Sequence, residues 1–99
     1  MANLDEKISI IPLSSIAKLL NIKLRTLRMY KEKGLLPQKD NQKRLYSIED
    51  IKWIELIHYL ATIQKINVNG IKYILKLCNK SLLDKNILFE EVERTLRVN

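Results

Sequence analysis

The stretch Ile22–Tyr46, IKLRTLRMYKEKGLLPQKDNQKRLY, decides the fold, because it combines a short cationic helix, a glycine stop and a basic hairpin. Nothing in Leu24–Lys33 interrupts a helix. On a period of 3.6 residues Leu24, Leu27 and Tyr30 share one face, and the other face carries Arg25, Arg28 and Met29. We therefore expect the first face to pack on the protein and the second to meet a partner.

The predicted helix stops at Gly34, which suits the left-handed position that follows a helix. Pro37 cannot continue a helix, and the polar run Gln38–Lys43 comes after it. Arg44–Tyr46 then returns with the alternation of a strand. The sequence thus predicts a small two-stranded wing directly after the cationic helix.

Length and composition bound the fold and the partner. The chain has 99 residues, 46% of them hydrophobic, and a formal net charge of +7. This length supports one domain with one core and leaves no room for a second, sensing domain. Only two glycines and two prolines are present, so a mostly α fold is expected. The positive charge favours a polyanion, either nucleic acid or an anionic membrane surface.

A helix is predicted on each side of this central stretch. Pro12–Ser15 is a helix-start pattern, and the helix runs to about Leu20 with Ile16, Leu19 and Leu20 facing inward. Asn21–Lys23 then links it to the cationic helix, which is the spacing of a helix-turn-helix. After the wing, Ser47–Asp50 has a capping-box pattern and opens a third helix.

The remainder of the chain is predicted to be helical. Asn67 or Asn69 can cap a fourth helix, and a weaker amphipathic helix is expected at about Ile87–Arg97. No apolar run approaches the ~18 to 20 residues that cross a membrane, and no signal peptide is recognisable, so we expect a cytoplasmic protein. The domain layout expected is a flexible N-terminus at residues 1–10, a winged helix-turn-helix domain at 11–78, and a short helical extension at 79–99 that could dimerise.

The segment IPLSSIAKLLNIKLRTLRMYKEKGLLPQKDNQKRLYSIEDIKWIELIHYL resembles the DNA-binding domain of MerR-family transcription regulators. The shared elements are Ala17–Leu19, Thr26–Tyr30, Gly34–Leu36, and Arg44–Ser47 with Asp50. The run Ile66–Leu75 is similar to the heat-shock repressor and nitrogen-regulator branch of that family. The resemblance implies a winged helix-turn-helix that binds paired DNA half-sites as a homodimer. It also implies regulation by repression or by distortion of promoter DNA, here without an effector domain.

Three residues depart from the pattern of the family. Lys23 stands where a helix-capping serine is common, Met29 replaces an aromatic residue that contacts a phosphate in many members, and Lys31 replaces a common glutamate. Together they remove one cap and one polar contact and add positive charge.

The predicted DNA contacts come from both basic elements. The cationic helix would enter the major groove, and the wing would bind the flanking backbone. The candidate residues are Lys18, Lys23, Arg25, Thr26, Arg28, Met29, Tyr30, Lys39, Asn41, Lys43, Arg44 and Tyr46. Tyr30 and Tyr46 fit packing at the edge of the core as well as they fit phosphate donation.

The sequence leaves other functions open. An excisionase-like or phage or plasmid accessory factor that bends DNA could use the same domain. A second alternative is a protein-interaction module that no longer binds DNA and holds a second copy or a regulatory protein. Its predicted interface consists of Trp53, Leu56, Tyr59, Leu88, Val92 and Leu96. No pattern for catalysis, a cofactor or a metal occurs in the sequence, so we expect a protein that is not an enzyme. The family resemblance implies a protein associated with the bacterial nucleoid.

Overall fold

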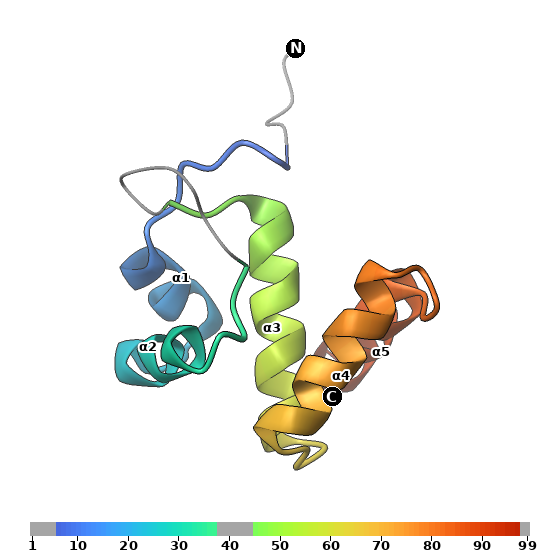
Figure 1. Ribbon diagram of the computed structural model, residues 1–99. Coiled ribbons are helices and arrows are strands. Elements are labelled where there is room, and N and C mark those ends of the chain that lie inside the picture. Colours follow the sequence, from blue (N-terminus) through green and yellow to red (C-terminus); the bar gives the residue numbers. More distant parts are fainter. Residues whose placement is uncertain (1–5, 38–44, 98–99) are drawn as a thin grey trace. The chain divides into compact units, whose positions relative to one another are not determined.

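The computed structural model describes residues 6–37 and 45–97 of the chain (Figure 1). The described part is mostly helical, as the sequence predicts, and the chain divides between Ile54 and Glu55 into two compact units. None of the helices in these ranges has the length and apolar character needed to cross a membrane.

The first unit contains helices α1 (Leu13–Leu20) and α2 (Leu24–Glu32) and the beginning of α3 (Ile48–Thr62). Figure 1 shows α1 and α2 joined by a short turn. At this turn Asn21 adopts the left-handed conformation with φ of 56°, and the Ile22 N–H donates to the Ala17 carbonyl at 2.9 Å. Asparagine tolerates this conformation, so three residues suffice to redirect the chain. The predicted link between the two helices is confirmed.

The buried face of α1 differs from the expected one. Ile16 and Ala17 are buried and Leu13 and Leu20 are half-buried, whereas Leu19 is 68% exposed. Residues 13, 16, 17 and 20 form one helical face by the spacing of three and four residues, and position 19 lies outside it. The expectation that Leu19 points inward is therefore wrong.

Helix α2 ends where the sequence predicts. Gly34 has φ of 77°, and the Leu35 N–H donates to the Tyr30 carbonyl at 3.0 Å, which closes the last turn. Leu35 and Leu36 are buried directly after this stop. The glycine therefore both ends the helix and returns the chain to the core.

The two-stranded wing is not found among the described residues, which contain no strand. The backbone N–H of Tyr46 donates to the Ile11 carbonyl at 2.7 Å, and the Tyr46 carbonyl accepts from Ile10 and Ile11. Tyr46 therefore uses both of its backbone polar groups on the segment before α1. The predicted turn at 38–44 lies outside the described residues.

The second unit contains the rest of α3, then α4 (Val68–Asn79) and α5 (Lys85–Arg97). Its buried side chains come from all three helices and include Leu56, Ile57, Leu60, Ile71 and Val92. Helix α5 begins two residues earlier than expected, where Asp84 Oδ1 accepts a hydrogen bond from the Asn86 N–H at 2.9 Å.

The start of α4 is locally determined. Asn67 Oδ1 accepts from the Gly70 N–H at 2.8 Å, which confirms the first of the two predicted caps. A Cβ atom at position 70 would lie 2.6 Å from Cγ2 of Ile66, so only glycine allows this close approach. The cap and the glycine together fix where the helix begins.

Candidate nucleic-acid interface

Helix α2 presents two faces of opposite character. Leu27 and Tyr30 are 0% and 3% exposed, whereas Arg25, Arg28 and Met29 are exposed. The helix is therefore held by one apolar face and leaves two guanidinium groups accessible on the other. This arrangement agrees with the prediction made from helical periodicity.

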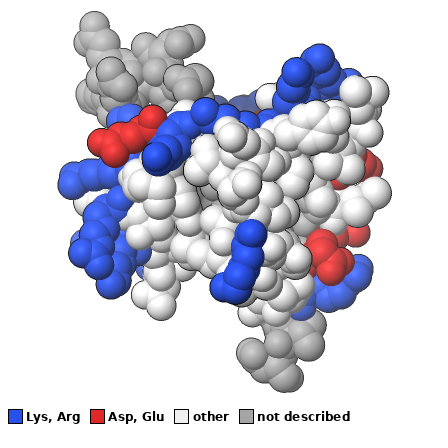
Figure 2. All heavy atoms as spheres, turned by 60° about the horizontal axis from the view of Figure 1, so that its bottom comes forward, with Lys and Arg blue, Asp and Glu red and all other residues white. Residues whose placement is uncertain are grey.

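Positive charge is concentrated on α1 and α2. Residues 13–34 contain six basic side chains and a single acid, Glu32. All six basic residues are exposed: Lys18, Lys23, Arg25, Arg28, Lys31 and Lys33. In Figure 2 several Lys and Arg side chains lie on the left, the α1 and α2 side, and others lie across the rest of the face shown. Such a surface attracts a polyanion over long range and binds it more weakly as salt is added.

The N-terminus of α2 adds to this positive character. Lys23 occupies the N-cap position in an extended conformation and makes no side-chain cap, and no acid lies in the first turn. The N-terminal end of a helix carries a partial positive charge from its first N–H groups. A cation at this end disfavours the free helix and favours a bound anion.

The two tyrosines among the candidates lie in the core. Tyr30 and Tyr46 are 3% and 2% exposed, and burial raises the pKa of Tyr30 above its usual value. The Tyr30 hydroxyl therefore stays protonated at neutral pH. Of the two roles left open by the sequence, the structure supports packing, and neither ring lies on the exposed face of α2.

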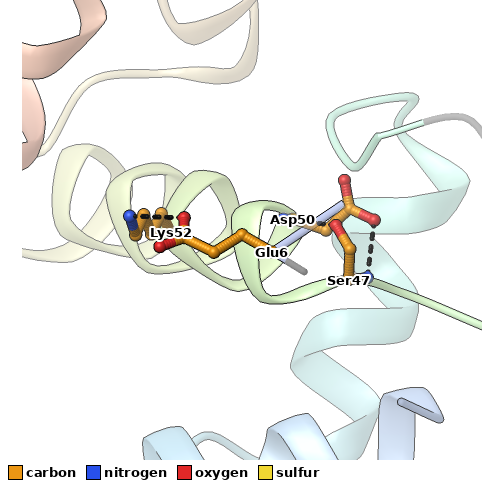
Figure 3. A network of polar contacts seen from close by, with 4 residues as sticks. All are labelled: Glu6, Ser47, Asp50 and Lys52. Carbon is orange, nitrogen blue, oxygen red and sulfur yellow. Dashed lines mark hydrogen bonds and ion pairs between the residues drawn. The ribbon is translucent and has the colours of Figure 1, made fainter. Parts of the chain in front are cut away.

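The start of α3 is anchored beside Tyr46 by the network in Figure 3. The Ser47 N–H donates to Asp50 Oδ2 at 2.9 Å, and the Asp50 N–H donates to Ser47 Oγ at 3.1 Å, so the predicted capping box is confirmed. Lys52 Nζ donates to Glu6 Oε1 at 2.9 Å, and the Glu49 N–H donates to the Glu6 carbonyl. Part of the segment expected to be flexible is thereby tied to α3.

The other predicted candidates are distributed as follows. Thr26 is half-buried on α2. The wing candidates Lys39, Asn41, Lys43 and Arg44 lie outside the described residues. Of the predicted interface residues, Leu56, Tyr59 and Val92 are buried within the single chain, Trp53 and Leu88 are half-buried, and Leu96 is 41% exposed.

A second cationic face, on α4, was missed in the sequence. Lys72 and Lys76 are exposed and lie four residues apart on one side of the helix, and the exposed Lys80 follows at its C-cap. The interval was visible in the sequence and could have identified the face.

His58 and Cys78 show no sign of a reactive site. Burial lowers the pKa of His58. Burial raises the pKa of the Cys78 thiol, and the negative charge of Asp84 raises it further. Both groups are therefore favoured in their neutral forms. Residues 6–37 and 45–97 contain no group of three or more His, Cys, Asp or Glu side chains that could hold a metal ion.

Comparison with protein families matches residues 11–78 to the MerR HTH regulatory proteins. The comparisons with curated proteins and with solved structures gave no match. The matched region contains α1, α2, α3 and nearly all of α4.

Proposed function

The chain belongs to the MerR HTH family of regulatory proteins, and from this premise we propose that it is a sequence-specific regulator of transcription that binds double-stranded DNA through α2. The observation that carries the proposal is the exposed cationic face of α2, opposite the buried Leu27 and Tyr30. The major groove of B-DNA admits an α-helix, and arginine is the side chain that most often pairs with a guanine edge there.

The roles within α1 and α2 follow from their chemistry. Arg25, Thr26 and Arg28 would face base edges from the first two turns of α2, as in other recognition helices. Lys18 and Lys23 would bind phosphates and fix the register of the protein. The same backbone role is assigned to Lys39, Asn41, Lys43 and Arg44 from the sequence alone.

Two copies would bind paired half-sites as a homodimer, since a symmetric operator requires a symmetric protein. The predicted interface retains accessible surface at Trp53, Leu88 and Leu96. Repression would follow from occupying promoter DNA. Sedimentation of the free protein tests the dimer, and a monomer at tens of micromolar would contradict it.

The experiment that tests DNA binding is a salt titration of the affinity for a random-sequence duplex, measured by fluorescence anisotropy. If two copies neutralise on the order of 6 to 8 phosphates, the logarithm of the binding constant should fall against the logarithm of salt with a slope of roughly −5 to −7. A flat response, or equal affinity for an acidic protein, would support the protein-interaction module instead.

A pair of matched variants assigns the binding to α2. Arg25→Gln with Arg28→Gln removes two exposed charges from α2, and Lys72→Gln with Lys76→Gln removes two from α4. We expect the α2 variant to lose much more affinity and to have a shallower salt dependence. Equal losses would mean that net charge decides binding, and the assignment to α2 would be wrong.

A further inference from the structure

Met29 places an apolar side chain beside Arg25, at the border of the cationic face of α2. It is 40% exposed and is the one exposed apolar residue of this helix, whose other exposed residues are Arg25, Arg28, Lys31 and Glu32. Leu24 on the same helix is half-buried and Leu27 is fully buried. Met29 is therefore covered in part by the protein and leaves the rest of its side chain open to a partner.

Arg25 and Met29 are four residues apart, which places their Cβ atoms about 5 to 6 Å from each other on the helix surface. Arg28 directly precedes Met29 in the chain. If α2 lies in the major groove, a side chain in this position reaches the same base edges as the guanidinium groups. By helical periodicity Arg25 and Arg28 lie on one side of Met29, and the half-buried Thr26 lies on the other. Met29 would therefore approach the base edges from the border of the cationic face.

The base edges in the major groove offer hydrogen-bonding groups and one kind of apolar group, the 5-methyl of thymine. A thioether side chain makes no strong hydrogen bond, and it gains free energy by covering apolar surface. Methionine is also unbranched and flexible, so it can follow a methyl group as the helix settles in the groove.

We propose that Met29 determines part of the sequence preference of this protein by packing on the 5-methyl group of a thymine next to the bases that Arg25 and Arg28 face. The proposal rests on the proposed function, because it requires α2 in the major groove. In this proposal Met29 recognises a methyl group from a position beside the charged side chains of α2.

The test uses duplexes enriched by the wild-type protein from a random-sequence synthetic library. In the best-bound duplex each thymine is replaced in turn by deoxyuridine, which lacks only the 5-methyl group. Synthetic DNA contains no 5-methylcytosine, so a methyl effect can come only from thymine. At one thymine in each half-site we expect about four-fold weaker binding. This factor corresponds to the free energy lost with one buried methyl group, ~0.8 kcal/mol.

Two variants at position 29 and one elsewhere isolate the contact. Met29→Leu should keep the difference between thymine and deoxyuridine, and Met29→Gln, which has a similar length and helix propensity, should abolish it. Leu19→Gln removes the more exposed Leu19 of α1 and should leave the difference unchanged. Circular dichroism and thermal melting confirm that the variants fold.

The outcomes distinguish this proposal from the proposed function. Salt-dependent duplex binding with no deoxyuridine effect, or with the same effect in Met29→Gln, overturns the assignment of Met29 and leaves DNA binding intact. Equal loss of the effect in Leu19→Gln also overturns it, because exposed apolar surface in general would then be responsible. Failure to bind any duplex removes both proposals.

Discussion

Helices α2 and α4 both expose a row of basic side chains, but they begin in opposite ways. Asn67 caps α4 with a hydrogen bond of 2.8 Å to the Gly70 N–H, whereas Lys23 at the start of α2 makes no side-chain cap. A good cap stabilises a helix by about 1 kcal/mol, and a cation at the N-terminus opposes the helix dipole. Helix α4 is therefore favoured locally, and α2 depends on its packing.

This difference suggests why α2 is the better candidate for binding a polyanion. Its exposed arginines and the uncapped end add positive potential that a phosphate would relieve, and Leu27 and Tyr30 hold the helix in place from the other side. In α4 the Gly70 N–H of the first turn already donates to the side chain of Asn67. The features that make α2 unfavourable in isolation are thus those that a bound DNA backbone would compensate.

The largest effect is expected from removing the packing on which α2 depends. Leu27 is 0% exposed, so Leu27→Ala should lower the free energy of unfolding by about 2 to 5 kcal/mol and weaken DNA binding as α2 loosens. Urea denaturation measures the first effect and anisotropy the second. Leu19→Ala, at a residue 68% exposed, is the control and should change stability by less than about 0.5 kcal/mol. A small loss in Leu27→Ala would show that α2 does not depend on this contact.

A smaller effect is expected from removing the local stabilisation of α4. Asn67→Ala should lower the free energy of unfolding by about 1 kcal/mol, because the Gly70 N–H loses its side-chain acceptor. Asn69→Ala, at an exposed position inside the same helix, should be neutral or slightly stabilising, since alanine has the higher helix propensity. Thermal melting of the two variants compares them, and equal behaviour would show that the cap contributes nothing.

The smallest effect, and the sharpest, comes from giving α2 the kind of cap that α4 has. Lys23 has φ of −64° and ψ of 136°, which suits a capping serine. Lys23→Ser should raise the free energy of unfolding by about 0.5 to 1 kcal/mol. If Lys23 binds a phosphate, the same change should lower the affinity for DNA and reduce the salt slope by ~0.9 for each phosphate that the variant no longer neutralises.

Lys33→Ser serves as the control for Lys23→Ser. It also removes one exposed cation, but at the C-terminal end of α2, where positive charge favours the helix. Stability should therefore not rise in this variant. The expectation is that Lys23 lowers the stability of α2 and raises its affinity for DNA. If Lys23→Ser raised both the stability and the DNA affinity, this expectation would be refuted.

Much of the fold follows from local sequence signals. The extent of α2, the stop at Gly34, the capping box of Ser47 and Asp50, and the cap at Asn67 each depend on residues within a few positions of one another. The exposed cationic face of α2 is also predictable, because helical periodicity separates Leu27 and Tyr30 from Arg25 and Arg28. These features need no knowledge of the remainder of the chain.

The predictions from sequence were wrong where contacts between residues far apart in the chain decide the structure. The alternation in Arg44–Tyr46 predicts one strand of a two-stranded wing, and no strand is found among the described residues. In the structure Tyr46 pairs instead with Ile11, 35 positions earlier in the chain. The burial of Tyr30 and Tyr46 likewise depends on the tertiary structure, and a tyrosine in a short pattern does not reveal it.

The sequence by itself therefore determined the order of the helices, the stop of α2 at Gly34, the capping box at the start of α3, the membership of residues 11–78 in the MerR HTH family, and the charge on α2. Only the tertiary structure decided that Leu19 is exposed, that Tyr30 and Tyr46 are buried, and that Tyr46 bridges to Ile11. The physical reason is the separation along the sequence over which each kind of interaction acts. Helix periodicity, capping and left-handed turns depend on neighbours within about one turn, whereas burial and strand pairing depend on which distant surfaces meet.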